Sequence, residues 1–109
     1  MGSRLGAMAR GYWVGRVTVT DEDAYQGYVR ANAAAFARYG ARFLVRGGRH
    51  EAVEGESRER NVVIEFPDYA AALECYRSPE YAEAMAHRRG AAIADIVVVE
   101  GYEGPQPGE

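Results

Sequence analysis

Residues 42–66, with the sequence RFLVRGGRHEAVEGESRERNVVIEF, constrain the fold of this chain more than any other stretch. Runs of β-branched and aromatic residues stand at both ends, with Gly47, Gly48 and many charged residues between them. This pattern predicts two β-strands joined by a long polar hairpin. Because glycine weakens a strand, the Gly47-Gly48 pair predicts a bulge or a sharp bend, after which residues 50–53 extend the first strand.

The segments that precede and follow this hairpin supply a helix and two more strands. Residues 12–19 and 95–100 are rich in valine and predict the first and the fourth strand in chain order. Residues 21–39 predict a helix, with Thr20 and Asp21 as capping residues and Gly40 at its end. At helical spacing its largest side chains share one stripe, which is made by Tyr25, Tyr28, Val29, Asn32, Phe36 and Tyr39.

The second helical segment is broken in two. Its first part follows Pro67 and has a stripe made by Tyr69, Leu73 and Tyr76. Ser78 and Pro79 then predict a fresh helix start. The order strand, helix, strand, strand, broken helix, strand is the ferredoxin-like βαββαβ pattern of the α+β class. It predicts a four-stranded antiparallel sheet in the order 4-1-3-2 with helices on one face.

Length and composition limit what such a chain can do. A length of 109 residues predicts one domain, which we expect over residues 9–102, after a leader or expression scar over residues 1–8 and before a disordered tail over residues 103–109. The net charge of -3 argues against a nucleic-acid partner. The single cysteine, Cys75, excludes an intrachain disulfide and favours a reducing cytoplasm. No apolar run approaches the roughly 20 residues of a membrane span, so no membrane partner is expected.

The face of the sheet away from the helices carries the functional argument. Strand alternation places Trp13, Val17, Val19, Phe43, Val45, Val62, Ile64 and Phe66 under the helices. It leaves on the other face Tyr12, Val14, Arg16, Thr18, Arg42, Leu44, Arg46, Asn61, Val63 and Glu65. One bulge would exchange part of these lists. Since this face has much apolar surface, we expect a second copy of the chain to cover it, which predicts a homodimer.

Such a dimer would enclose a pocket between each sheet and its partner. Arg16 and Arg46 would bind a small anionic or aromatic metabolite, and Glu65 would be the catalytic base. Asn32 and Tyr81 would line the mouth of the pocket. The alternative is a non-catalytic structural or interaction dimer, in which an arginine pairs with Glu65 as an internal salt bridge on the sheet face. Both hypotheses stay open at this point.

Other candidates are weaker. Asn32 has a second interpretation, in which its amide forms a hydrogen bond with a neighbouring backbone group. Arg88 lies near a helix C-terminus, which favours an interaction with the helix dipole. Glu83 and His87 stand four residues apart, but two ligands are more typical of a surface pair than of a metal site. The sequence has no motif for a flavin, nicotinamide, haem or phosphate, so no cofactor and no metal are expected. An RNA-binding module of this topology would need stacking aromatic residues on the open sheet face and a basic surface. Tyr12 alone and a net charge of -3 do not meet this requirement.

Four segments resemble a known family. GYWVGRVTVTDEDAYQGYV, AAFARYGARFLVRGG, RNVVIEFPDYAAALECYRSPEY and ADIVVVEGY are similar to the bacterial domain-of-unknown-function family DUF1330, and the resemblance covers about residues 9–102. It implies a ferredoxin-like monomer and a homodimer of facing sheets, the dimeric α+β barrel. It implies no established activity. Related branches include cofactor-free monooxygenases, lactone isomerases and stress-response proteins, but no motif here matches theirs, so no catalytic residue is carried over.

Overall fold

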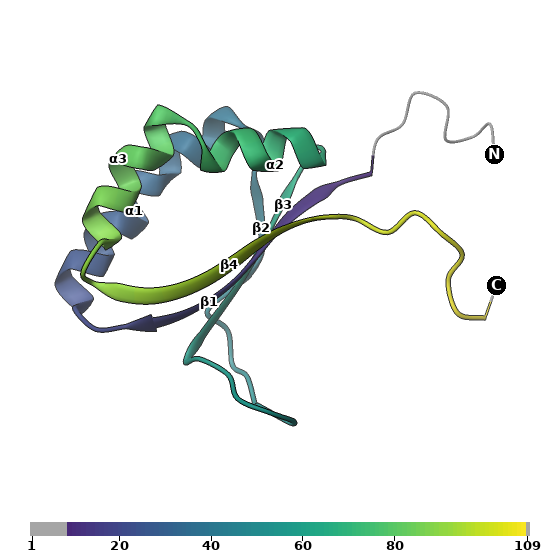
Figure 1. Cartoon of the computed structure of the whole chain (residues 1–109), viewed down its shortest axis with the longest axis horizontal. Coiled ribbons are helices and arrows are strands. Elements are labelled where there is room, and N and C mark those ends of the chain that lie inside the picture. The colour runs from purple at the N-terminus through teal and green to yellow at the C-terminus, as the bar shows by residue number, and fades with distance from the viewer. Residues whose placement is uncertain (1–8, 109) are drawn as a thin grey trace.

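The computed structural model describes residues 9–108, and its elements follow the predicted order. The elements are β1 (Gly11–Val19), α1 (Glu22–Arg38), β2 (Arg42–Arg46), β3 (Arg60–Phe66), α2 (Tyr69–Tyr76), α3 (Pro79–Arg88) and β4 (Ala92–Glu100). The strands form one antiparallel sheet in the order β2-β3-β1-β4, which is the predicted order read from the other edge. All three helices lie on one side of this sheet (Figure 1). The predicted fold class is therefore confirmed.

The expectation for residues 1–8 falls outside the described part of the chain. Residues 101–108 contain no helix or strand, and the expected disorder of the tail stays a prediction. Within residues 9–108, no helix has both the length and the apolar character needed to cross a membrane.

Each helix begins at a polar side chain that accepts a backbone hydrogen bond. Asp21 Oδ1 accepts from the N–H of Ala24 at the start of α1, at 3.1 Å. Asp68 caps α2 in the same way, and Ser78 caps α3. After α1, Gly40 has a φ of 70°, a left-handed conformation that favours glycine. The capping residues thus fix where the chain turns between strand and helix.

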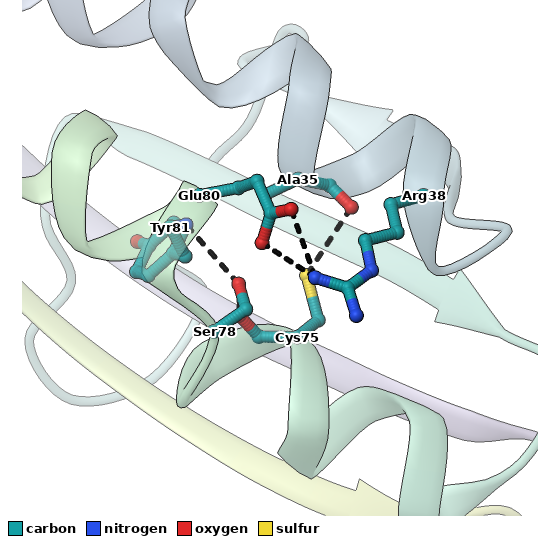
Figure 2. Close-up of polar contacts among 6 residues, drawn as sticks. All are labelled: Ala35, Arg38, Cys75, Ser78, Glu80 and Tyr81. Atoms are coloured by element: carbon teal, nitrogen blue, oxygen red, sulfur yellow. Dashed lines mark hydrogen bonds and ion pairs between the residues drawn. The ribbon is translucent and has the colours of Figure 1, made fainter.

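The break between α2 and α3 is tied to α1 by polar contacts, which Figure 2 shows. Ser78 Oγ donates a hydrogen bond to the carbonyl oxygen of Cys75 at 2.7 Å. The Cys75 thiol lies 3.8 Å from the carbonyl oxygen of Ala35 in α1. On the surface, Arg38 Nη1 lies 2.9 and 2.8 Å from the two carboxylate oxygens of Glu80. The Cys75 contact therefore links α2 to α1, and the ion pair of Arg38 with Glu80 links α3 to α1.

The core between helices and sheet is aromatic and centres on Trp13. Its ring centroid lies 5.2 Å from that of Phe36, 5.4 Å from that of Phe66 and 5.0 Å from that of Tyr81. The pairs with Phe36 and Tyr81 pack edge to face, which adds to the stabilisation from apolar burial. The indole Nε1 of Trp13 donates to the carbonyl oxygen of Ala72 at 2.8 Å, which satisfies its only polar group.

The predicted stripe of α2 is wrong. Ala72 and Cys75 are fully buried, whereas Tyr69 and Tyr76 are each 38% exposed. The reason is the close approach of α2 to the sheet, where a side chain on Gly11 would collide with the backbone at the start of the helix. Only small side chains fit beneath a helix that lies this close, so the large rings point to its flank.

The hairpin loop over residues 47–59 contains no strand, so the predicted extension over residues 50–53 is wrong. Residues 50–53 are exposed. At its start, the loop is held by a hydrogen bond from the N–H of Gly47 to the carbonyl oxygen of Asn61 at 2.8 Å, and further attachments lie near its end. There Arg58 Nε lies 2.8 Å from Asp95 Oδ2, and Glu59 Oε1 accepts from the N–H of Val19 at 2.8 Å. The chain bends at Gly47, which has a φ of 69°, so of the two predicted alternatives the sharp bend is confirmed and the bulge is not.

A bulge does occur in β2, but at Leu44. The register shifts there, so that Val45 pairs with Val63 and Arg46 pairs with Val62. Since Val62 faces the helices, Arg46 lies on the helix-covered face and Val45 lies on the open face. The predicted faces of Arg46 and Val45 are therefore wrong, because one extra residue inverts the alternation of all that follow it.

Candidate functional site

A cavity of about 40 Å³ lies between the helices and the sheet. We call it the helix-side cavity, and the residues that matter to its chemistry are Trp13, Gly15, Asn32, Arg46, Arg60 and Arg88. The walls come from α1, α3 and all four strands, so every element except α2 contributes. Most of the lining is apolar or aromatic, which makes the arginine side chains its main polar groups.

Arg60 enters the cavity from the start of β3. The strand alternates, so Arg60 faces the helices together with Val62 and Ile64. Its guanidinium carbon lies 5.7 Å from the ring centroid of Tyr25, within the range of a cation–π contact. Its Nε is buried and has no hydrogen-bond partner among residues 9–108. A charged donor is therefore directed into an apolar layer without an acceptor.

Arg88 enters the same cavity from the last turn of α3. Its guanidinium carbon lies 5.1 Å from the ring centroid of Tyr28, and its Nη2 donates to Tyr81 Oη at 3.3 Å. Its Nε, like that of Arg60, is buried without a hydrogen-bond partner in the described residues. The position at a helix end agrees with the sequence, but the side chain turns inward and lines the cavity.

The charge of the cavity is not balanced. Arg46, Arg60 and Arg88 line it, and no aspartate or glutamate does. Arg46 is exposed, and its guanidinium carbon lies 3.9 Å from the ring centroid of Phe43 at the edge of the sheet. In the described residues the ion pairs lie elsewhere, between Arg38 and Glu80, Arg42 and Glu65, and Arg58 and Asp95.

Two buried tyrosines lie behind Arg88. The hydroxyl oxygens of Tyr28 and Tyr81 are 2.8 Å apart. Burial raises the pKa of both phenols, so both are neutral at physiological pH and neither acts as a phenolate base. Asn32, buried at the centre of α1, lines the cavity. Tyr81 is fully buried in the core, so the prediction that it lines a pocket mouth is wrong.

The open face does not bring the predicted anion clamp together. Glu65 lies opposite Tyr12, whose hydroxyl donates to Glu65 Oε2 at 3.2 Å, and Arg42 Nη1 lies 3.7 Å from Glu65 Oε1. Arg16 lies four residues beyond Tyr12 in β1. At the rise of a β-strand this separates Arg16 from Tyr12, and so from Glu65, by ~13 Å. Arg46 is on the opposite face. The structure therefore separates the three charged residues that the sequence placed in one pocket.

A second hollow, of about 220 Å³, lies on the open face where the hairpin loop returns to the sheet. It is lined by Arg16, Glu56, Ser57, Arg58 and Asp95. Two arginines face two carboxylates, and Arg58 already pairs with Asp95. This hollow therefore has no unbalanced charge. Among residues 9–108, no group of three or more histidine, cysteine, aspartate or glutamate side chains is placed to bind a metal.

The sequence reasoning missed three residues of the cavity. Arg60 shares the alternation of Val62 and Ile64, and this signal would have placed it under the helices. The position of Arg88 at a helix end favoured an interaction with the helix dipole instead of a place in a cavity. Gly15 interrupts a run of strand residues, and an isolated glycine inside a strand is itself a signal of close approach.

Comparison with solved structures supports the fold. A protein of unknown function from Rhodopseudomonas palustris, RPA0582, is 22% identical with a TM-score of 0.71, over 88% of this chain and 85% of that chain. SnoaB, a cofactor-independent oxygenase from Streptomyces nogalater, is 16% identical with a TM-score of 0.59, over 93% of this chain and 99% of that chain. A conserved protein of unknown function from Bacteroides thetaiotaomicron, described as a possible oxidoreductase, is 12% identical with a TM-score of 0.57, over 86% of this chain and 99% of that chain. These identities show a shared fold alone.

No curated protein matches the chain. The family comparison gives a match over residues 10–102, which is nearly the whole of the described domain. The match has the description "Domain of unknown function (DUF1330)". It agrees with the resemblance that the strand and helix motifs carry, and the chain therefore belongs to the DUF1330 family.

Proposed function

We propose that this protein binds a small anionic metabolite in the helix-side cavity. The observation that carries the proposal is the unbalanced arginine set, in which two buried Nε atoms have no acceptor among the described residues. A buried charged donor without a partner is destabilising, whereas a bound carboxylate or phosphate supplies both the acceptor and the opposite charge. Guanidinium groups suit such anions because they bind two oxygens at once.

This proposal moves the pocket from one side of the sheet to the other. The sequence placed it between the open face and a partner, with Arg16, Arg46 and Glu65 as its charged residues. The geometry supports a cavity that keeps Arg46 and Asn32 and adds Arg60 and Arg88. Glu65 lies on the other face, so it has no part in this proposal as a catalytic base. SnoaB is a cofactor-independent oxygenase, but turnover without a cofactor is not needed for the binding proposed here.

Thermal unfolding in the presence of anions tests the proposal. Sodium acetate and sodium phosphate are compared with sodium chloride at equal ionic strength and pH 7.5. An anion at ten times its dissociation constant stabilises the folded state by about 1.4 kcal/mol. This corresponds to a rise of roughly 5 °C in the melting temperature of a domain of this size. No rise with either anion would contradict the proposal.

Arginine variants show where the anion binds. Arg60→Met with Arg88→Met should abolish the anion-dependent rise, because methionine fills similar space without charge. The double variant also loses the hydrogen bond from Arg88 Nη2 to Tyr81 Oη, so its anion response is measured against its own melting temperature in chloride. The matched control is Arg16→Met, which lies on the open face and should keep the full anion response. A response that survives in the double variant would place the site elsewhere.

We also propose that a second copy of the chain covers the open face. The exposed apolar side chains on this side of the sheet are Val14, Val45, Ile93, Val97 and Val99. A contiguous patch of this kind is typical of an interface. Light scattering after size exclusion should give a dimer that Val97→Lys converts to a monomer. Val53→Lys, at the exposed tip of the hairpin loop, should leave the dimer intact.

A wild-type monomer would contradict the dimer. A dimer without any anion response would favour the structural alternative. In that case the open-face ion pairs of Arg42 with Glu65 and Arg58 with Asp95 would serve the dimer alone.

A further inference from the structure

Gly15 is an unexpected residue at its position. It lies in the middle of β1, pairs with Val62 on one side and Ile96 on the other, and is buried. Its neighbours on the same face are Trp13 and Val17, which are both core residues. Glycine weakens the interior of a strand and leaves nothing to pack, so a glycine in a central strand calls for a specific reason.

Neither the backbone nor the packing supplies that reason. Gly15 is not among the described glycines with positive φ, so its conformation suits any residue. A Cβ at Gly15 would lie 3.5 Å from Ile96 Cγ1 and 3.9 Å from the carbonyl oxygen of Asp95, which are ordinary contacts. Gly11 in the same strand is different, because a Cβ there would collide with the backbone of Asp68. Packing therefore requires Gly11 and leaves Gly15 unexplained.

The missing side chain of Gly15 opens the floor of the helix-side cavity. Around it the lining is apolar, with Trp13, Val17, Phe36 and Ile96. The volume of about 40 Å³ is room for roughly three water molecules, at about 10–15 Å³ for each. Water needs several polar partners, which an apolar floor does not provide. A short apolar group would fit this floor better than water does.

We infer that the anion bound in this cavity is a short-chain carboxylate, of roughly two to four carbons by this volume, whose apolar body lies over Gly15. The inference rests on the proposed function, since the carboxylate group is the anion that Arg60 and Arg88 bind. Inorganic phosphate would satisfy the guanidinium groups but not the apolar floor. An aromatic carboxylate would exceed the volume. The ligand class therefore follows from two separate features, the arginines for its charge and Gly15 for its body.

Isothermal titration with a homologous series tests the ligand class. The probes are acetate, propionate, butyrate, benzoate, phosphate and the neutral propionamide, at pH 7.5 and constant ionic strength. Each buried methylene is expected to tighten binding about fourfold from acetate to butyrate. Benzoate and propionamide are expected to bind at least tenfold more weakly than propionate.

Gly15→Ala and Gly15→Val test the position of the body. Both variants should fold at least as stably as the wild type, because an added side chain fits and strengthens the strand. Both should lose the gain from acetate to butyrate, and Gly15→Val should weaken propionate at least tenfold while phosphate binding stays within twofold. The matched control is Ala94→Val, which adds volume to the same face of the sheet outside the cavity lining. It should leave the whole series unchanged.

The outcomes separate this inference from the proposed function. Arginine-dependent binding of phosphate and carboxylates with no dependence on chain length would overturn the short-chain body and leave the anion site intact. Benzoate as the tightest ligand, or a series insensitive to Gly15→Val, would overturn the inference in the same way. Absence of any anion binding would overturn both.

Discussion

Replacement of Tyr81 by phenylalanine tests the polar network behind the cavity. Tyr81 is fully buried, and its hydroxyl oxygen lies 2.8 Å from Tyr28 Oη and 3.3 Å from Arg88 Nη2. Tyr81→Phe removes one oxygen atom and keeps the ring that packs 5.0 Å from Trp13. The aromatic core therefore stays, and the change isolates the two hydrogen bonds.

The expected cost follows from those two contacts. A neutral hydrogen bond contributes about 0.5–1.5 kcal/mol net, and one with a charged donor contributes about 1.5–3 kcal/mol. The contact with Arg88 is long at 3.3 Å, so we place it at the low end. The sum is roughly 2–3 kcal/mol. For a domain of this size that lowers the melting temperature by about 10 °C.

Urea unfolding at fixed protein concentration measures this cost. The control is Tyr76→Phe, which removes a hydroxyl from a ring that also packs on Trp13 but is 38% exposed, and it should change stability by less than about 0.5 kcal/mol. In a double-mutant cycle, Tyr28→Phe with Tyr81→Phe should cost about 1 kcal/mol less than the sum of the single changes, because neither hydroxyl is left alone. Additive costs, or a Tyr81→Phe variant as stable as the wild type, would refute the network.

Two further predictions concern the junction of α2 and α3. Burial raises the pKa of Cys75 to about 12, above the ordinary value of about 8.5 for an unfolded chain. The folded state therefore keeps the thiol proton to higher pH than the unfolded chain does. The contribution of this proton to the free energy of unfolding is present below pH 8.5 and is lost as pH rises toward 12, by up to about 1.4 kcal/mol per pH unit. Cys75→Ala should give a shallower loss of stability between pH 8.5 and 9.5 in urea unfolding, and an unchanged slope would contradict this. Ser78→Ala should cost about 1 kcal/mol through loss of the α3 cap, whereas Ser57→Ala in the exposed loop should cost almost nothing in the same assay.

The sequence predicted the sheet well because alternation is a steric property of single strands. In β1 and β3 most residues at alternate positions are apolar, and every residue that the sequence assigned to a face of these two strands lies on the predicted face. β2 gave no such signal for its bulge. Phe43, Leu44 and Val45 are all good strand residues on either face, so only pairing with β3 decides which one is extra. The misplaced Arg46 follows directly from that.

The phase of α2 failed for a different reason. Periodicity ranks residues by size and hydrophobicity, and it therefore chose Tyr69 and Tyr76. The buried face of α2 is decided by the short distance between helix and sheet, which leaves room only for small side chains such as those of Ala72 and Cys75. A local sequence pattern carries no information about that distance. The candidate site was predictable in part. Asn32 was recognised as an unusual residue on an apolar stripe, but the cavity that it lines needs side chains from six elements at once.

Trp13 gives this molecule an optical reporter of its own core. It is the only tryptophan in the sequence, it is almost fully buried, and it lines the helix-side cavity. Its indole is fixed by the hydrogen bond to the carbonyl oxygen of Ala72 and by rings on several sides. All tryptophan fluorescence therefore originates from one rigid, apolar environment next to the proposed binding site. Emission wavelength and quenching by acrylamide would report cavity occupancy and unfolding without any label.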